Sequence, residues 1–79
     1  MSIQIAIIMG SQSDWEVMSN SSKTLRNLDI SHESRVISAH RTPDLLDEYI
    51  GQCEEGDVKV IIAGAGLSAA LPGVIAAKT

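Results

Sequence analysis

The sequence predicts an α/β protein built on a parallel sheet. Three short segments that we expect to form strands, at residues 3–9, 32–37 and 58–63, each precede a segment with helical periodicity. The first and third runs are apolar on both faces, which is typical of strands buried between layers of helices. Strands that alternate with helices pair in parallel through right-handed crossovers. Sheets usually have about five or more strands, so we expect residues 1–79 to form a single but partial domain.

The first strand should lead into a helix that begins at Ser13. Gly10 ends the apolar run, and Ser13 stands three residues before Glu16, which is the spacing of a capping box. Four apolar residues then recur on roughly one helical face: Trp15, Met18, Leu25 and Leu28. A turn at residues 27–31 precedes the second strand. The outer part of that strand is polar and includes His32, a residue that we expect to be solvated, so the strand is expected toward a sheet edge.

The second helix has clear start and stop signals. Thr42 can cap it, Pro43 suits its first turn, and Asp44 favours the positive end of the helix dipole. Gly56 is a natural stop. The apolar stripe of this helix consists of Leu46, Tyr49, Ile50 and Cys53.

The third strand, at residues 58–63, ends at the Gly64–Gly66 segment. A third helix should follow, with Leu71, Val74 and Ile75 available for packing, although the Pro72-Gly73 pair leaves its first residue open. The last apolar strand would present a bare sheet edge. We therefore expect a further part of the domain, or another chain, to cover it.

Composition limits the classes of function. The formal charge of −4 argues against a nucleic-acid partner, which would need a basic surface. No apolar run approaches the roughly 20 residues of a membrane span, and no basic region precedes a signal-peptide core. Cys53 is the one cysteine, so no internal disulfide can form, which fits a cytoplasmic protein. No second Cys or His is placed to complete a metal site, so no metal is expected.

Chemistry-bearing residues follow each strand, where parallel α/β sheets bind their ligands. In the first loop, Gly10 allows a tight turn, Ser11 can donate a hydroxyl proton, and Asp14 can accept from sugar hydroxyls. The amides at the start of the next helix suit a phosphate. The same loop also fits a capped helix start that binds nothing.

In the second loop, a histidine and an arginine stand side by side. Histidine as a residue type suits a group that must give and take a proton, which makes His40 a candidate for that role, while Arg41 can hold a phosphate with its planar fork of donors. A plain surface loop is the alternative. The third loop, residues 64–73, is rich in small residues that let the backbone approach a planar ligand, or let a helix pack closely on a strand. It matches neither a dinucleotide fingerprint nor a Walker loop.

Together the three loops closely resemble the N5-carboxyaminoimidazole ribonucleotide mutase family, the class I form of phosphoribosylaminoimidazole carboxylase. The resemblance runs over residues 3–79 and rests on residues 9–15, 38–43 and 61–73, of which Ser-Ala-His-Arg-Thr-Pro is the most discriminating segment. It implies a flavodoxin-like three-layer α/β/α sandwich, with the first strand between the second and third. This chain would supply the N-terminal half of that domain.

The resemblance also implies an activity. The family is an isomerase of de novo purine biosynthesis that moves a carboxylate from the exocyclic N5 to ring carbon C4 of its small-molecule substrate, aminoimidazole ribonucleotide, without metal or organic cofactor. Carried onto this sequence, His40 is the general acid and base, and Ser11, Asp14 and Arg41 bind the ribose phosphate portion. The other expected substrate-binding residues are Gly10, Ser13, Ser38, Ala39, Gly66, Leu67 and Ser68. The family forms octamers, which implies a homo-oligomer.

The sequence departs from the family pattern in two ways. Leu67 and Ala70 replace a Gly and a His of the usual third loop, which removes one hydrogen-bonding side chain near the site. Family members also run to about twice this length. Three alternatives therefore stay open: the mutase, a CO2-using carboxylase on the same fold, and a truncated, catalytically inactive remnant.

Overall fold

The computed structural model, which describes residues 2–66 and 70–79, has the expected alternation of strands and helices. In chain order the elements are β1 (Ile5–Met9), the short 3-10 helix η1 (Gln12–Asp14), α1 (Trp15–Asn27), β2 (His32–Val36), α2 (Pro43–Glu55), β3 (Val60–Gly64) and α3 (Ala70–Lys78). Within the described residues, three strands form one parallel sheet in the order β2-β1-β3. The predicted central position of the first strand is confirmed.

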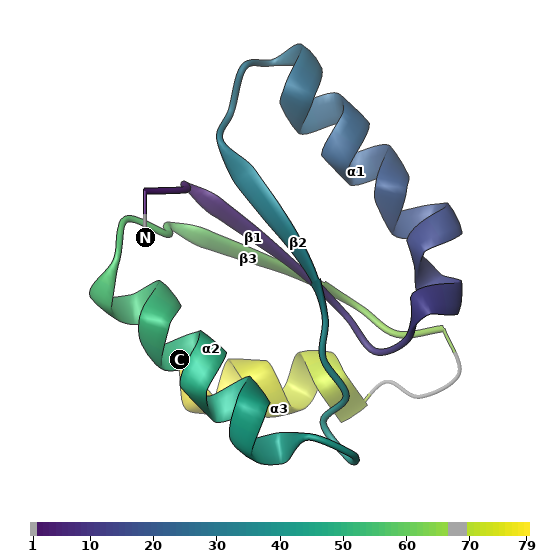
Figure 1. Ribbon diagram of the computed structural model, residues 1–79, viewed down its shortest axis with the longest axis vertical. Helices are drawn as coiled ribbons and strands as arrows, with labels where there is room; N and C mark the ends of the chain where they lie inside the picture. Colours follow the sequence, from purple (N-terminus) through teal and green to yellow (C-terminus); the bar gives the residue numbers. More distant parts are fainter. Residues whose placement is uncertain (1, 67–69) are drawn as a thin grey trace.

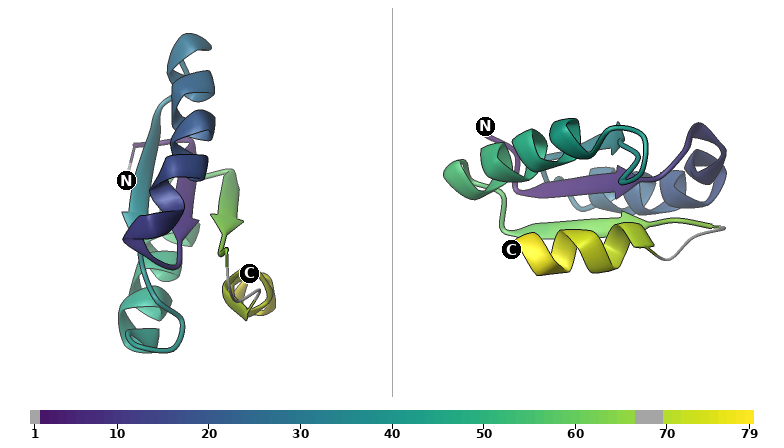
Figure 2. Two further views of the ribbon diagram at one scale, coloured as in Figure 1. Left: turned by 90° about the vertical axis from the view of Figure 1, so that its right-hand side faces the viewer. Right: turned by 90° about the horizontal axis from the view of Figure 1, so that it is seen from below.

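Helices cover both faces of the sheet, as Figures 1 and 2 show, with α1 on one face and α2 and α3 on the other. The strand β1 is buried between them, and its side chains alternate. Ala6 and Ile8 join the α2 and α3 layer, whereas Ile7 and Met9 join Leu25 of α1. The rest of the larger cluster comprises Ile37, Leu46, Tyr49, Ile50, Cys53, Leu71 and Ile75.

The apolar runs are longer than the paired strands. The strand β1 begins at Ile5, two residues later than predicted, and β3 spans Val60–Gly64 where residues 58–63 were expected. Ile3 and Val58 still pack against the larger cluster. An apolar run therefore marks burial, whereas the strand limits depend on backbone pairing.

The predicted cap of the first helix is wrong. Ser11 and Asp14, not Ser13 and Glu16, form the capping box. The Ser11 N–H donates to Asp14 Oδ2 at 3.1 Å, and the Asp14 N–H donates to the Ser11 carbonyl at 3.1 Å. This cap begins η1, which runs directly into α1. Both residue pairs have the same spacing, so the pattern alone could not choose between them.

The apolar face of α1 is narrower than predicted. Leu25 is buried and Met18 half-buried, but Leu28 is 63% exposed and Trp15 37% exposed. The helix ends at Asn27, within the expected turn. It therefore covers the sheet with fewer side chains than the sequence suggested.

His32 is half-buried and hydrogen-bonded, which corrects the expectation of a solvated residue. Its Nδ1 lies 2.9 Å from the Ile30 carbonyl, and its Nε2 lies 2.8 Å from Ser22 Oγ. Because a carbonyl can only accept, Nδ1 donates to it, and in the neutral ring Nε2 accepts from the Ser22 hydroxyl. The buried Ser22 thus joins α1 to the start of the edge strand β2.

The second helix agrees with its prediction. It spans Pro43–Glu55, with Thr42 as N-cap residue and Gly56 as C-cap residue, and its four-residue apolar stripe is buried. One detail differs, because the Thr42 hydroxyl makes no capping bond and donates instead to the Ser38 carbonyl at 3.0 Å. The third helix contains the Pro72-Gly73 pair, and Leu71 and Ile75 are buried as expected.

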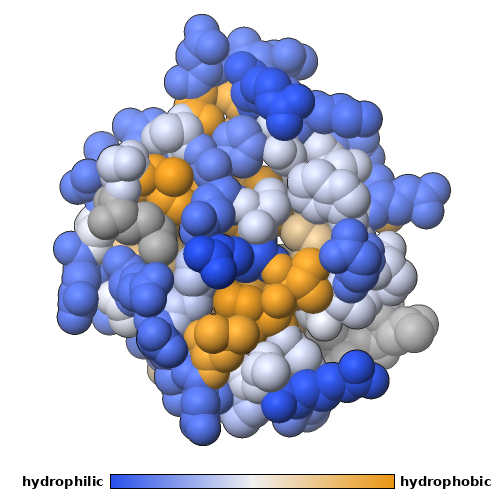
Figure 3. Space-filling model, viewed as in Figure 1, coloured by the Kyte–Doolittle hydropathy of each residue, from blue (hydrophilic) through white to orange (hydrophobic). Residues whose placement is uncertain are grey.

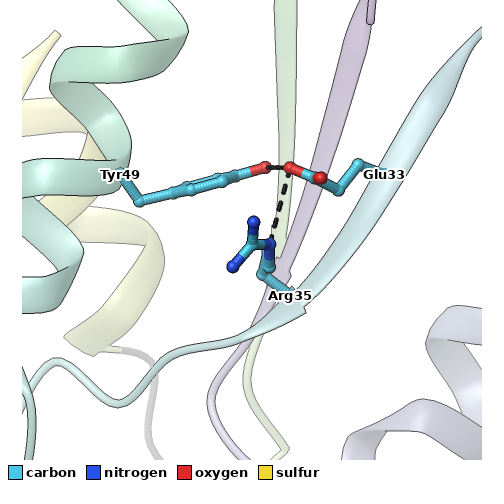
Figure 4. A network of polar contacts seen from close by, with 3 residues as sticks. All are labelled: Glu33, Arg35 and Tyr49. Carbon is cyan, nitrogen blue, oxygen red and sulfur yellow. Dashed lines mark hydrogen bonds and ion pairs between the residues drawn. The ribbon is translucent and has the colours of Figure 1, made fainter. Parts of the chain in front are cut away.

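A polar cluster joins α2 to the edge strand β2 (Figure 4). The Tyr49 hydroxyl donates to Glu33 Oε2 at 2.6 Å, and Arg35 Nε lies 3.5 Å from the same oxygen. The Arg35 guanidinium also lies 5.1 Å from the centre of the Tyr49 ring. Burial, and then the hydrogen bond to Glu33, raise the pKa of Tyr49 well above its ordinary value. The cluster therefore fixes both elements that flank the loop carrying His40.

None of the helices in the described part of the chain is both long and apolar enough to cross a membrane.

Candidate functional site

The three predicted loops meet at the carboxyl ends of the strands. In the sheet register Met9 stands beside Val36 on one side and Gly64 on the other. The three strands therefore end at the same level, and the loops that follow them leave the sheet from its carboxyl-terminal end. Pairing continues beyond the strands, because the Gly10 N–H donates to the Gly64 carbonyl at 3.3 Å and the Ile37 N–H donates to the Met9 carbonyl at 2.9 Å. The rigid sheet therefore sets the relative positions of the loops.

A cavity of about 240 Å³ lies between these loops. Its lining residues are Gly10, Ser11, Ser13, Asp14, Ser38, Ala39, His40, Ala65, Gly66 and Leu71. All four predicted residues of the first loop are present, together with His40 at an exposed position. Ala65 and Leu71 were not among the predicted site residues, and they contribute apolar surface to the cavity wall. Both lie near Gly66 in the sequence, which could have suggested them, but neither side chain carries a polar or titratable group.

Asp14 connects the first loop with the third. Its Oδ1 accepts from the Gly66 N–H at 3.0 Å, and its Oδ2 accepts from the Ser11 N–H at 3.1 Å. The Ser11 hydroxyl lies 3.4 Å from Oδ2 and 2.7 Å from Ser13 Oγ. A carboxylate has about four acceptor positions. Asp14 can therefore accept from a ligand hydroxyl without losing these backbone donors.

Ser38 organises the second loop. Its Oγ accepts from the Arg41 N–H at 3.1 Å, and its carbonyl accepts from the Thr42 N–H at 3.0 Å. These bonds close the chain into a turn around His40. Ser38 thus has a structural part in the loop as well as a place in the cavity wall.

Arg41 lines a different hollow from His40. This second hollow, of about 450 Å³, is lined by Gly10, Ser11, Gln12, Val36, Ser38, Arg41 and Thr42. It adjoins the His40 cavity, because Gly10, Ser11 and Ser38 line both. The two side chains, which are adjacent in the sequence, therefore line two neighbouring hollows.

The two hollows have different electrostatic character. A guanidinium favours an anion in the Arg41 hollow, with the Ser11 hydroxyl beside it. The carboxylate of Asp14 makes the His40 cavity less favourable for an anion and more favourable for a ligand that donates hydrogen bonds. An elongated ligand with a phosphate at one end and a hydroxyl-bearing portion at the other therefore fits the pair of hollows.

A larger hollow of about 500 Å³ lies elsewhere, between α2, α3 and β3. Its wall includes Cys53, Ile61 and Ile75, and it contains none of the predicted site residues. Burial raises the pKa of Cys53, which disfavours the reactive thiolate. We therefore place the candidate site at the strand ends.

Two of the predicted site residues, Leu67 and Ser68, lie outside the described residues. Over the residues that are described, no group of three or more His, Cys, Asp or Glu side chains could hold a metal ion.

Comparison with known proteins agrees with the resemblance seen in the loops. The sequence model of the AIR carboxylase family matches residues 4–79. An N5-carboxyaminoimidazole ribonucleotide mutase from Brucella melitensis is 54% identical over 79 residues, which is 100% of this chain and 49% of the relative. One from Bacillus subtilis is 53% identical over 75 residues, which is 95% of this chain and 46% of the relative.

A longer relative also contains the segment. A bifunctional purine synthesis protein from Dictyostelium discoideum is 52% identical over 75 residues, which is 95% of this chain but 8% of that protein. This chain spans about half the length of the mutases that it matches.

Proposed function

The chain belongs to the AIR carboxylase family, and on that premise we propose that it supplies the catalytic loops of an N5-carboxyaminoimidazole ribonucleotide mutase of purine biosynthesis. The observation that carries this proposal is the convergence of three loops on the His40 cavity and the adjoining Arg41 hollow. The two mutases are 54% and 53% identical to the chain over 100% and 95% of its length.

The two hollows divide the substrate between them. The phosphate lies in the Arg41 hollow, beside the Ser11 hydroxyl, and the ribose hydroxyls donate to Asp14. The aminoimidazole then lies against the small residues Ala39 and Gly66, next to His40. Because the phosphate is remote from the reacting bond, its binding energy serves to position the imidazole.

His40 transfers the single proton that the rearrangement requires. When the carboxylate leaves N5 as CO2, the bond electrons stay on the nitrogen, which takes a proton from the imidazolium. When C4 then bonds to CO2, the ring carbon must lose its proton, and the neutral imidazole accepts it. One imidazole can perform both transfers, because it gives a proton in the first step and takes one back in the second, and it ends in its starting state.

We also propose that the chain works as a homo-oligomer that encloses this cavity. Figure 3 shows an apolar patch over the end of β2 and the neighbouring α2. Val36 and Leu45, the exposed large apolar side chains of these elements, are 43% and 48% exposed. His40 is itself exposed, so a neighbouring subunit would help to exclude water and retain CO2.

The test separates binding from turnover. Aminoimidazole ribonucleotide is titrated calorimetrically, and carboxylate transfer is followed with the N5-carboxy substrate. We expect His40→Asn to lower turnover by about 10²–10⁴-fold while the dissociation constant changes by less than about threefold, because the phosphate contacts lie in the other hollow. His32→Asn is the control, since His32 stands at the opposite end of β2 and should leave turnover intact in folded protein. Equal loss of binding and turnover in His40→Asn would contradict the assignment.

Two alternatives give different results in the same assay. A CO2-using carboxylase, the activity in the name of the matched family, would depend strictly on added bicarbonate. An inactive remnant, an alternative that Ala70 in place of the usual His favours, would bind aminoimidazole ribonucleotide without any turnover.

A further inference from the structure

The Asp14 carboxylate stands between two backbone N–H groups that converge from distant parts of the chain. Ser11 precedes Asp14 by three residues, whereas Gly66 follows it by 52. Both donors line the His40 cavity, and Asp14 is half-buried. Converging N–H groups of this kind are the donors with which proteins bind anions. In this chain the anion between them is one of its own side chains.

We propose that Asp14 is a positioning residue that acts as an internal anion. It holds Gly66 against the first loop, and it occupies the two amides that would otherwise donate to a phosphate beside His40. Its negative charge also repels a phosphate dianion from the Ser11 and Gly66 amides. The substrate phosphate is thereby confined to the Arg41 hollow, which orients the imidazole toward His40. This last consequence rests on the proposed function, whereas the exclusion of phosphate from the cavity does not.

A side chain at position 66 would meet this contact directly. A Cβ at position 66 would lie 3.0 Å from Asp14 Oδ1, which is closer than ordinary van der Waals contact. Gly66 does not have a positive φ, so its backbone conformation would accept a side chain. A Cβ at Gly73, by contrast, would meet nothing within 4 Å. A side chain at position 66 would therefore have to shift the Asp14 carboxylate.

The first experiment locates bound phosphate. Inorganic phosphate is titrated into ¹⁵N-labelled protein, and backbone amide shifts are followed by NMR. In the wild-type chain we expect saturable shifts at Gln12, Arg41 and Thr42 and none at Gly66. In Asp14→Ala the NMR signal of the Gly66 amide should shift as well. The phosphate affinity measured at this amide should be at least about tenfold higher in the variant than in the wild type. A purely structural role for Asp14 would not move the phosphate.

The second experiment tests the contact of Asp14 with the Ser11 and Gly66 amides in the absence of ligand. Hydrogen exchange at the Gly66 amide should become about tenfold faster in Asp14→Ala. Gly66→Ala should accelerate exchange at the Ser11 amide, because the new Cβ displaces the carboxylate, but it should have no such effect in the Asp14→Ala background. Gly73→Ala is the control and should leave both amides unchanged. If Asp14→Ala does not fold, Asp14→Asn replaces it, since an amide oxygen and an NH2 group cannot accept from both backbone donors.

The outcomes separate this inference from the proposed function. Phosphate shifts at Gly66 in the wild type, or equal Gly66 exchange in the wild type and the Asp14 variant, would overturn the role of Asp14 whatever the substrate does. Failure to bind aminoimidazole ribonucleotide, with the phosphate and exchange results as expected, would overturn the mutase proposal alone.

Discussion

Replacing Tyr49 by phenylalanine tests the polar cluster that fixes α2 to β2. The change removes one oxygen, and with it the 2.6 Å hydrogen bond to Glu33, while the buried ring keeps its place. The contact between the ring and the Arg35 guanidinium is also kept. The decrease in the free energy of unfolding therefore measures the contribution of the hydroxyl and little else.

The structure sets the size of the expected loss. A hydrogen bond to a charged acceptor contributes about 1.5–3 kcal/mol, and removal of one partner leaves the other to be solvated. The Glu33 side chain is 31% exposed, so water can take the place of the hydroxyl. We therefore expect the low end, about 1.5 kcal/mol. For a domain of this size that corresponds to a fall in Tm of roughly 6–12 °C.

The change in stability with pH above pH 10 gives a second test of the cluster. Because burial and Glu33 raise the pKa of Tyr49 in the folded state, its contribution is fully present below pH 10.0, the ordinary pKa of tyrosine. It is lost as the pH rises above that value, since the unfolded chain releases the phenolic proton first. Tyr49→Phe should remove this loss, so its stability should fall less steeply above pH 10 than that of the wild type.

Urea unfolding, followed by far-UV circular dichroism at one protein concentration, measures both effects. Glu33→Gln and the double variant complete a mutant cycle, in which we expect a coupling of at least about 0.5 kcal/mol. A loss below about 0.5 kcal/mol in Tyr49→Phe, with an unchanged alkaline slope, would refute the reasoning.

Three further predictions concern the core and the sheet edge. Leu46→Ala should lower the free energy of unfolding by about 2–5 kcal/mol, because the side chain is 0% exposed; a loss under about 1 kcal/mol would mean that the site collapses around the smaller residue. Cys53, whose pKa is raised by burial, should react with iodoacetamide at pH 8 at least about 10²-fold more slowly in folded protein than in urea. The chain should self-associate in sedimentation experiments, and Val60→Lys at the β3 edge should weaken this association while Val17→Lys on α1 should not, since these side chains are 50% and 70% exposed.

The sequence predicted the elements whose signals agree with one another. The second helix was placed correctly because its cap position, its proline, its buried stripe and its terminal glycine all indicate the same limits. The first helix was not, because two pairs with the spacing of a capping box overlap and Ser22 takes a buried position that periodicity assigns to an apolar residue. Local patterns cannot show that a serine will meet His32 across the fold.

The site could be predicted in part for the same reason. Parallel strands bring their following loops to one edge, so the meeting of Gly10, Ser38 and Gly66 followed from topology. The separation of Arg41 from His40 did not, because adjacent residues in a turn can face different hollows. Nor did the contact between Asp14 and Gly66, since it depends on how far one side chain reaches across the sheet edge.

The two outer strands differ in a way that favours growth of the sheet at β3. The edge strand β2 carries Glu33 and Arg35, and charges on an edge discourage pairing with another chain. The edge strand β3 is Val-Ile-Ile-Ala-Gly, without any charge, and in the described part of the chain it pairs only with β1. An apolar strand with unpaired backbone groups gains both hydrogen bonds and burial from a further strand. The third loop follows the carboxyl end of β3, so a strand that pairs with β3 would lie beside this loop. Completion of the sheet and completion of the His40 cavity would therefore occur on the same side of the molecule.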